Sequence, residues 1–168
     1  MALSKNLFSM VVSSTPTSRK TPIHLHPNES SASPVIVFVT VCTHQKKRIL
    51  AQHDIHGLLK MTWERASHWI VGRYVIMPDH IHLFCSPAAK KSSDLAAWIS
   101  FWKSQAARQW PRPDEHPIWQ RSCWDTQLRR GESYQRKWEY VVQNPVRAGL
   151  CSRAEEWAFQ GELCSLAW

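Results

Sequence analysis

The stretch that decides the fold is Val75–Phe84, which reads VIMPDHIHLF. Two apolar runs flank the short polar link Pro78-Asp79, and two such runs joined so closely predict a β-hairpin. We therefore expect one strand within Trp69–Met77 and a second over Ile81–Cys85, antiparallel to each other.

The chain before this hairpin predicts a strand and then a helix. Val35–Val41 is a run rich in β-branched residues, which is typical of a buried strand. Side chains then recur at helical spacing, so a helix is expected over roughly residues 52–68. The stripe that this helix would bury is Ile55, Leu58, Leu59, Thr62 and Ala66.

The chain after the hairpin predicts a second helix, a loop, a fourth strand and a third helix. Ser92 or Ser93 can cap the second helix, whose apolar face is Leu95, Trp98, Ile99, Trp102 and Ala106. The prolines of Pro111–Pro117 mark the loop, Cys123–Leu128 is the candidate strand, and Glu132–Gln143 is the candidate helix. This order predicts an α+β fold, a ferredoxin-like or RRM-like antiparallel sheet with helices packed on it.

Composition divides the chain into two parts. Residues 1–33 are rich in Ser, Thr and Pro and predict a mobile tail, whereas residues 34–168 are expected to form a single domain. The formal net charge of +8 favours a polyanionic partner, nucleic acid before an anionic membrane. A solvated basic surface accounts for the charge equally well, so charge alone assigns no function.

Other features of composition exclude some classes of protein. No apolar run approaches the roughly 20 residues of a membrane helix, so no membrane contact is expected. The five cysteines lie far apart without a CxxC pair, which favours buried thiols in a reducing cytoplasm over disulfides or a zinc site. Most of the ten tryptophans are expected in the core, although some could stack on nucleic-acid bases.

Two histidines in the second hairpin strand are the first candidates for chemistry. Alternate strand residues point to the same face, so His80 and His82 should project together while Ile81 enters the core. Two neighbouring imidazoles can hold a divalent metal ion. The alternative is a pair of surface histidines on an edge strand. His24 and His26 have the same spacing, but they lie in the predicted tail and are assigned no role.

The third predicted helix carries a candidate nucleophile. Tyr140 and Asn144 are four residues apart and would share a helix face, while Tyr134 would lie on a different one. Arg136 and Lys137 add charge for a phosphate backbone. Asn144 precedes a proline, which disfavours helical geometry and leaves its direction open. The alternative for Tyr140 is an ordinary core tyrosine.

Together these residues resemble the REP-associated tyrosine transposases, relatives of the single-tyrosine (IS200-like) transposases among the HUH nucleases. The resemblance runs from about Val35 to Trp168. The histidine pair and the Tyr-x-x-x-Asn-Pro-Val segment, in this order, are its most specific marks. The full set is Phe38-Val39-Thr40, Met77–Leu83, Trp119-Gln120-Arg121, Trp124-Asp125, Tyr140 with Asn144–Leu150, Gly161-Glu162-Leu163 and Trp168.

The resemblance implies an HUH nuclease fold and a role for each marked residue. Tyr140 falls on the nucleophile, His80 and His82 on the metal ligands, and Asn144 on the third ligand. The metal would be Mg²⁺ or Mn²⁺. The implied activity is cleavage and rejoining of single-stranded or hairpin DNA through a 5′-phosphotyrosine intermediate. A catalytically silent DNA-binding module on the same fold is the alternative, and monomer and homodimer both stay open.

Overall fold

The computed structural model describes residues 35–89, 92–128 and 131–166, so the predicted tail over residues 1–33 lies outside it. Its centre is a five-stranded sheet in the order β4-β1-β3-β2-β5, in which every neighbouring pair is antiparallel. The strands are β1 (Ile36–Thr43), β2 (Trp69–Ile76), β3 (His80–Pro87), β4 (Trp119–Leu128) and β5 (Gln160–Glu162). The predicted α+β fold with an antiparallel sheet is confirmed.

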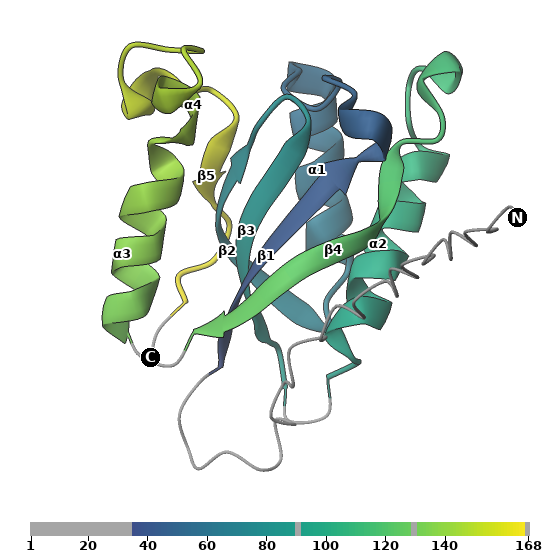
Figure 1. Ribbon diagram of the computed structural model, residues 1–168. Coiled ribbons are helices and arrows are strands. Elements are labelled where there is room, and N and C mark those ends of the chain that lie inside the picture. The colour runs from purple at the N-terminus through teal and green to yellow at the C-terminus, as the bar shows by residue number, and fades with distance from the viewer. Residues whose placement is uncertain (1–34, 90–91, 129–130, 167–168) are drawn as a thin grey trace, which may run out of the picture.

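The helices cover the two faces of the sheet unequally (Figure 1). Helices α1 (His53–Arg65) and α2 (Leu95–Arg108) pack on one face, and α3 (Gly131–Val142) lies on the other and leads into the short α4 (Asn144–Arg147). Single 3-10 turns occur at η1 (His44–Lys46), η2 (Pro113–Glu115) and η3 (Ala154–Glu156).

The alternation of β1 explains why both faces are buried. Val37, Val39 and Val41 point into the larger core beneath α1 and α2, and Ile36 and Phe38 point into a smaller core beneath α3. A strand that is apolar on both faces belongs in the middle of a sheet. The continuous β-branched run in the sequence therefore marks a central strand.

The hairpin between β2 and β3 forms as the sequence predicted. The backbone N–H of Met77 donates to the carbonyl of His80 at 2.8 Å, which closes the link at Pro78-Asp79. The Thr43 side chain donates to the Asp79 carbonyl at 3.0 Å and ties this turn to the end of β1. Because β3 pairs with β1 on one side and β2 on the other, the histidine pair lies on a central strand, not on an edge.

Several predicted details are wrong. The N-cap of α2 is Asp94, not Ser92 or Ser93, and no side-chain hydrogen bond caps the helix; the Ser92 hydroxyl donates to the Ala89 carbonyl instead. β4 begins at Trp119, four residues before the predicted start. All five cysteines are free, but only Cys42 and Cys85 are buried, whereas Cys123 and Cys151 are half-buried and Cys164 is exposed. No helix of the described ranges is long and apolar enough to cross a membrane.

Candidate active site

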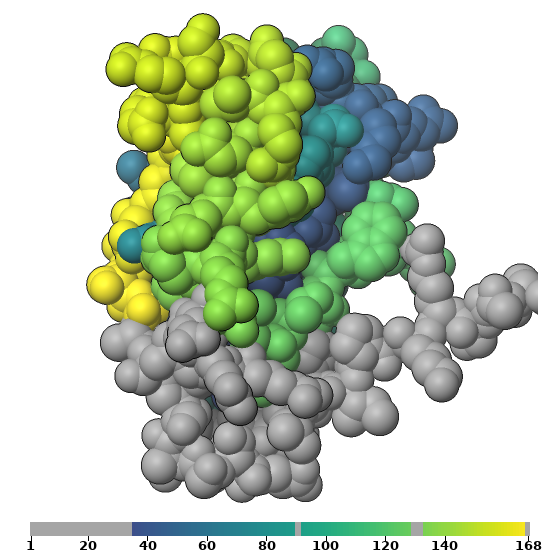
Figure 2. Space-filling view, turned by 60° about the vertical axis from the view of Figure 1, so that its left-hand side comes forward, coloured from purple at the N-terminus to yellow at the C-terminus, as the bar shows by residue number. Residues whose placement is uncertain are grey.

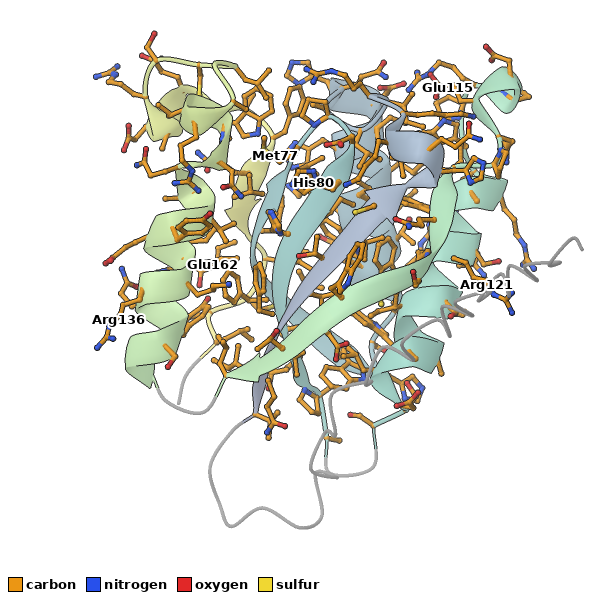
Figure 3. All side chains as sticks on the ribbon, viewed as in Figure 1. Met77, His80, Glu115, Arg121, Arg136 and Glu162 are labelled. Atoms are coloured by element: carbon orange, nitrogen blue, oxygen red, sulfur yellow. The ribbon has the colours of Figure 1, made fainter. Side chains whose placement is uncertain are left out.

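His80 and His82 lie on the face of β3 that is turned toward α3. Ile81 between them is fully buried in the core on the opposite face, as strand alternation requires. The Nε2 atoms of the two imidazoles lie 3.2 Å apart. Figure 3 shows His80 at the hairpin end of β3. The two rings therefore present one nitrogen each to a common point.

The spacing of these two nitrogens fits joint coordination of one metal ion. Metal–imidazole bonds of about 2.1 Å put two adjacent ligand nitrogens about 3.0 Å apart at a right angle and about 3.4 Å apart at a tetrahedral angle. The observed 3.2 Å lies between these values. Imidazole nitrogens are donors that suit divalent transition-metal ions.

The outer nitrogen of each ring has its own hydrogen-bond partner. Nδ1 of His80 donates to the Asp79 carboxylate at 2.6 Å, and Nδ1 of His82 lies 2.9 Å from the Thr40 hydroxyl. Histidines that bind metals in proteins are usually held in this way, because the partner orients the ring and leaves the other nitrogen free to donate its lone pair.

Burial keeps His82 uncharged. Desolvation, with smaller electrostatic effects of the neighbouring His80, Lys137 and Lys46 side chains, lowers the pKa of His82 from 6.5 to about 3. The neighbouring Asp79 carboxylate opposes this shift only weakly. A neutral imidazole is the form that binds a metal ion, so His82 is in the binding form across the physiological range.

Tyr140 lies on α3 with its ring exposed to solvent. It is 61% exposed, whereas Tyr134 on the same helix is 8% exposed and packs against Phe84. The alternative of Tyr140 as a core tyrosine is therefore wrong. Figure 2 shows part of β1 uncovered between α3 and β4, so the sheet face beside this helix is open.

Two cations flank the Tyr140 ring. The Arg147 guanidinium lies 4.1 Å from the ring centroid, and the Lys137 ammonium lies 6.0 Å from it. Lys137 is also 4.6 Å from the ring of Phe38, which stacks on His82 with 5.3 Å between ring centroids. A continuous row of contacts thus joins the tyrosine to the histidine pair, with positive charge beside the tyrosine ring.

The structure does not bring Asn144 to the histidines. Gln143 interrupts the helix, so Asn144 begins α4 and does not continue the face of Tyr140 on α3. Its Oδ1 accepts a hydrogen bond from Arg147, which also donates to the Tyr140 carbonyl at 2.6 Å. Within the described ranges, no contact joins Asn144 to His80 or His82, and no group of three His, Cys, Asp or Glu side chains is placed to hold a metal ion.

Of the basic residues around the histidine pair, some face it and others point away from it. Arg136 lies on the side of α3 turned away from the sheet (Figure 3), so of the two basic residues proposed for phosphate only Lys137 faces the site. Lys46 reaches the site from the turn after β1, with Nζ 3.8 Å from the Asp79 carboxylate. Its backbone is left-handed, with φ of 57°, a conformation that is uncommon for a residue other than glycine.

Sequence reasoning assigned no role to Thr40, Asp79 or Lys46. A signal existed for Asp79, which directly precedes His80 and can reach its ring. A signal also existed for Thr40, the one polar side chain within the apolar run of β1. Neither position could be matched to a particular histidine without the strand register, which pairs Thr40 with His82.

On this fold, a histidine pair lies on a central strand and an exposed tyrosine lies on a neighbouring helix. A solved structure of a REP-associated tyrosine transposase bound to a REP hairpin superposes with a TM-score of 0.67, at 16% identity, over 85% of this chain and 81% of that one. The predicted HUH fold is confirmed.

Sequence comparison points to the same proteins. A REP-associated tyrosine transposase of Haemophilus influenzae is 28% identical over 95 residues, which cover 50% of this chain and 53% of that protein. The REP-associated tyrosine transposase of Escherichia coli is 23% identical over 104 residues, which cover 62% of this chain and 59% of that protein. The matches thus span little more than half the length of these relatives. No family model matches the chain.

Proposed function

We propose that this protein is a DNA strand transferase of the single-tyrosine type, which cleaves and rejoins single-stranded or hairpin DNA. Tyr140 is the nucleophile, and His80 and His82 bind a divalent metal ion. The observation that carries the proposal is the convergence of the two Nε2 atoms, 3.2 Å apart, on the sheet face that Tyr140 adjoins. The similarity to transposases, one of them bound to a REP hairpin, supports DNA as the substrate.

The chemistry is a transesterification. The Tyr140 oxygen attacks the phosphorus and loses its proton, an O–P bond forms, and the bond to the 3′ oxygen breaks. That oxygen leaves as a 3′-hydroxyl, and the 5′ phosphate stays on Tyr140. Because one phosphate ester replaces another, a second hydroxyl can reverse the step without ATP.

The charged residues of the site suit this reaction. Lys137 and Arg147 flank Tyr140 and would bind the phosphate on either side of the attacking oxygen. A metal ion bound between His80 and His82 would supply Lewis-acid stabilisation of charge on the phosphate oxygens. Two protein ligands leave coordination positions open for phosphate oxygens, as a catalytic rather than a structural site requires.

We propose Asn144 as the third metal ligand, but this role requires a change in the position of α4. Its Oδ1 now accepts from Arg147. An amide oxygen has two lone pairs, so it can keep this bond and still coordinate a cation. Ligation by Asn144 would require α4 to approach β3 when metal and DNA bind.

The test is covalent trapping of DNA. End-labelled single-stranded hairpin DNA from the regions that flank the gene is incubated with the protein and Mg²⁺, Mn²⁺ or EDTA, and separated on a denaturing gel. The native chain and Tyr134→Phe should form a protein–DNA adduct that depends on metal, and Tyr140→Phe should form none.

Tyr134→Phe is the matched control because the same hydroxyl is removed from the same helix on its buried side. An adduct that persists in Tyr140→Phe would overturn the assignment of the nucleophile. DNA binding without any adduct in the native chain would establish the catalytically silent DNA-binding module in place of the enzyme.

A further inference from the structure

Trp124 lies in the same row of the sheet as the histidine pair. The strand register pairs Trp124 of β4 with Thr40 of β1, and Thr40 with His82 of β3. Directly opposed residues of antiparallel strands point to the same face. The Thr40 side chain reaches His82 at 2.9 Å, so this row lies on the face of the candidate active site. Trp124 therefore borders the site from the strand opposite α3.

Trp124 differs from the other tryptophans in its exposure. Among the nine that lie in the described ranges, it alone is an exposed residue, with 43% of its surface accessible. Its neighbours on the same face of β4, Ser122 and Thr126, are small and exposed as well. The face of β4 beside the site thus presents one large aromatic side chain between two short polar ones.

The distance from Trp124 to the histidines matches a short stretch of nucleic acid. Neighbouring strands are about 4.8 Å apart, so two strand steps place the backbone of Trp124 about 10 Å from that of His82. Stacked nucleotides advance about 3.4 Å each along one strand, so this distance corresponds to about three of them. A base that contacts Trp124 would lie within a few nucleotides of a phosphate at the histidine pair.

The positive charge on the α3 side of the open sheet face, opposite Trp124, agrees with nucleic acid as the ligand. Lys137 and Arg147 line the α3 side of the open face, and Lys46 lies at the hairpin end. A basic track for the backbone combined with an exposed aromatic ring for the bases is the usual construction of a site for single strands. Figure 2 shows the uncovered part of β1 between the two borders.

We propose that Trp124 binds an unpaired nucleobase by stacking, next to the phosphate that Tyr140 attacks. The proposal rests on the proposed function for the identity of the ligand and deepens it. A base inside a duplex has both faces covered by its neighbours and cannot stack on Trp124. The tryptophan therefore makes the site selective for DNA that is unpaired at the point of cleavage.

The experiment separates base stacking from charge. Fluorescence anisotropy measures the binding of a labelled oligo-dT and of an abasic oligonucleotide of equal length and charge, with EDTA present. The proteins carry Tyr140→Phe, so no strand is cut, and are compared with and without Trp124→Leu, Trp124→Phe and Phe101→Leu. Phe101 is the matched control because its ring is 48% exposed on α2, which covers the other face of the sheet.

Trp124→Leu should weaken oligo-dT binding about 5- to 150-fold, the range for loss of one base–aromatic stack. It should leave abasic binding unchanged. Trp124→Phe should retain part of the lost affinity, and Phe101→Leu should have no effect. Equal weakening of both ligands by Trp124→Leu, or no weakening of either, would overturn the proposal.

Failure of this inference and failure of the proposed function give different results. If the native chain forms the Tyr140 adduct but Trp124→Leu leaves oligo-dT affinity unchanged, only the stacking site is wrong. If the native chain forms no adduct but Trp124→Leu selectively weakens oligo-dT binding, the stacking site stands and the enzymatic proposal fails.

Discussion

At the scale of single residues, the candidate metal ligands are held from outside by Asp79 and Thr40. Each of these side chains bonds to the Nδ1 atom of one histidine, and the two Nε2 atoms are thereby aimed at each other. The two Nε2 atoms lie at hydrogen-bond distance from each other, 3.2 Å, and joint binding of a metal ion requires a lone pair on both of them. Loss of one outer partner should therefore weaken metal binding while both histidines stay in place.

Thr40→Val tests the role of the Thr40 hydroxyl, because valine has nearly the same shape and should disturb the packing little. We expect it to weaken Mn²⁺ binding about 10-fold or more, because partners of this kind typically contribute a factor of 10–100 in metal affinity. Isothermal titration calorimetry with Mn²⁺ measures the change. Thr126→Val is the matched control, since Thr126 is an exposed threonine on the same face that does not contact either histidine. Equal affinity of the two variants would contradict the role of Thr40.

His82 also makes the stability of the protein depend on pH. Its pKa is lowered to about 3 in the folded state from 6.5. Between these values the unfolded chain takes up a proton at His82 and the folded chain does not. This contribution to stability is therefore fully present above about pH 6.5 and is lost as the pH falls toward 3.

At pH 5 the loss should be up to about 2 kcal/mol in the free energy of unfolding, from 1.36 kcal/mol for each pKa unit. Urea unfolding at pH 7 and pH 5, in EDTA, measures it for the native chain and for His82→Gln. The variant should lose less stability between the two pH values. If both proteins lose the same amount, burial of a neutral His82 is not the cause.

The residues that could be predicted are those whose chemistry is local in the sequence. His80 and His82 are two apart on a strand, so their common direction follows from the pleat alone. The exposure of Trp124 and the partner of Asn144 depend on contacts between distant segments. The sequence alone therefore does not show which of the ten tryptophans is exposed or where the side chain of Asn144 points.

At the scale of elements, α3 has one buried side and one side that carries residues of the candidate site. Tyr134 and Val141 are buried in the smaller core, and Lys137 and Tyr140 face the open sheet or solvent. Arg73 of β2 lies 5.5 Å from the Tyr134 ring and 5.4 Å from the Trp138 ring, so it packs between the helix and the sheet. The position of Tyr140, the proposed nucleophile, therefore depends on the packing of α3 against the smaller core.

Val141→Ala should reduce the free energy of unfolding by about 1.5–3 kcal/mol, because two buried methyl groups are lost and a cavity remains. Val141 is 1% exposed, whereas Val142 beside it is only half-buried. Val142→Ala makes the same change in helix propensity, so it should reduce the free energy of unfolding clearly less than Val141→Ala does. Chemical denaturation of both variants decides this, and a larger loss for Val142→Ala would mean that α3 docks by a different face.

The long elements were predictable and the short ones were not. β1, α1, β2, β3, α2 and α3 each carry a run or a period that the sequence displays. β5 has only three residues, Gln160–Glu162, and forms because it pairs with β2 at the sheet edge. The start of β4 is not visible in the sequence because its first half is mostly polar and none of its residues is buried. The existence of β5 and the start of β4 both depend on the strands that they pair with, and those strands lie far away in the sequence.

At the scale of the whole molecule, the net charge of +8 should govern DNA binding. Each phosphate that the protein neutralises contributes a slope of about −0.7 to log K against log salt for single strands. Several contacts should therefore produce a steep fall in affinity between about 50 and 200 mM salt. Anisotropy titrations of single-stranded hairpin DNA with Tyr140→Phe measure this slope, and affinity that stays flat with salt would contradict it.

The two halves of the candidate site lie on parts of the protein that open in different ways. β3 is paired on both sides, so its amide hydrogens should exchange with solvent only when the sheet as a whole comes apart. Helix α3 rests on one face and can detach while the sheet survives. On warming, the proposed metal binding by His80 and His82 should therefore persist up to global unfolding, whereas Tyr140, the proposed nucleophile, should leave the site at a lower temperature. Inactivation by heat would then begin as a reversible separation of helix α3 from the sheet, with both still folded.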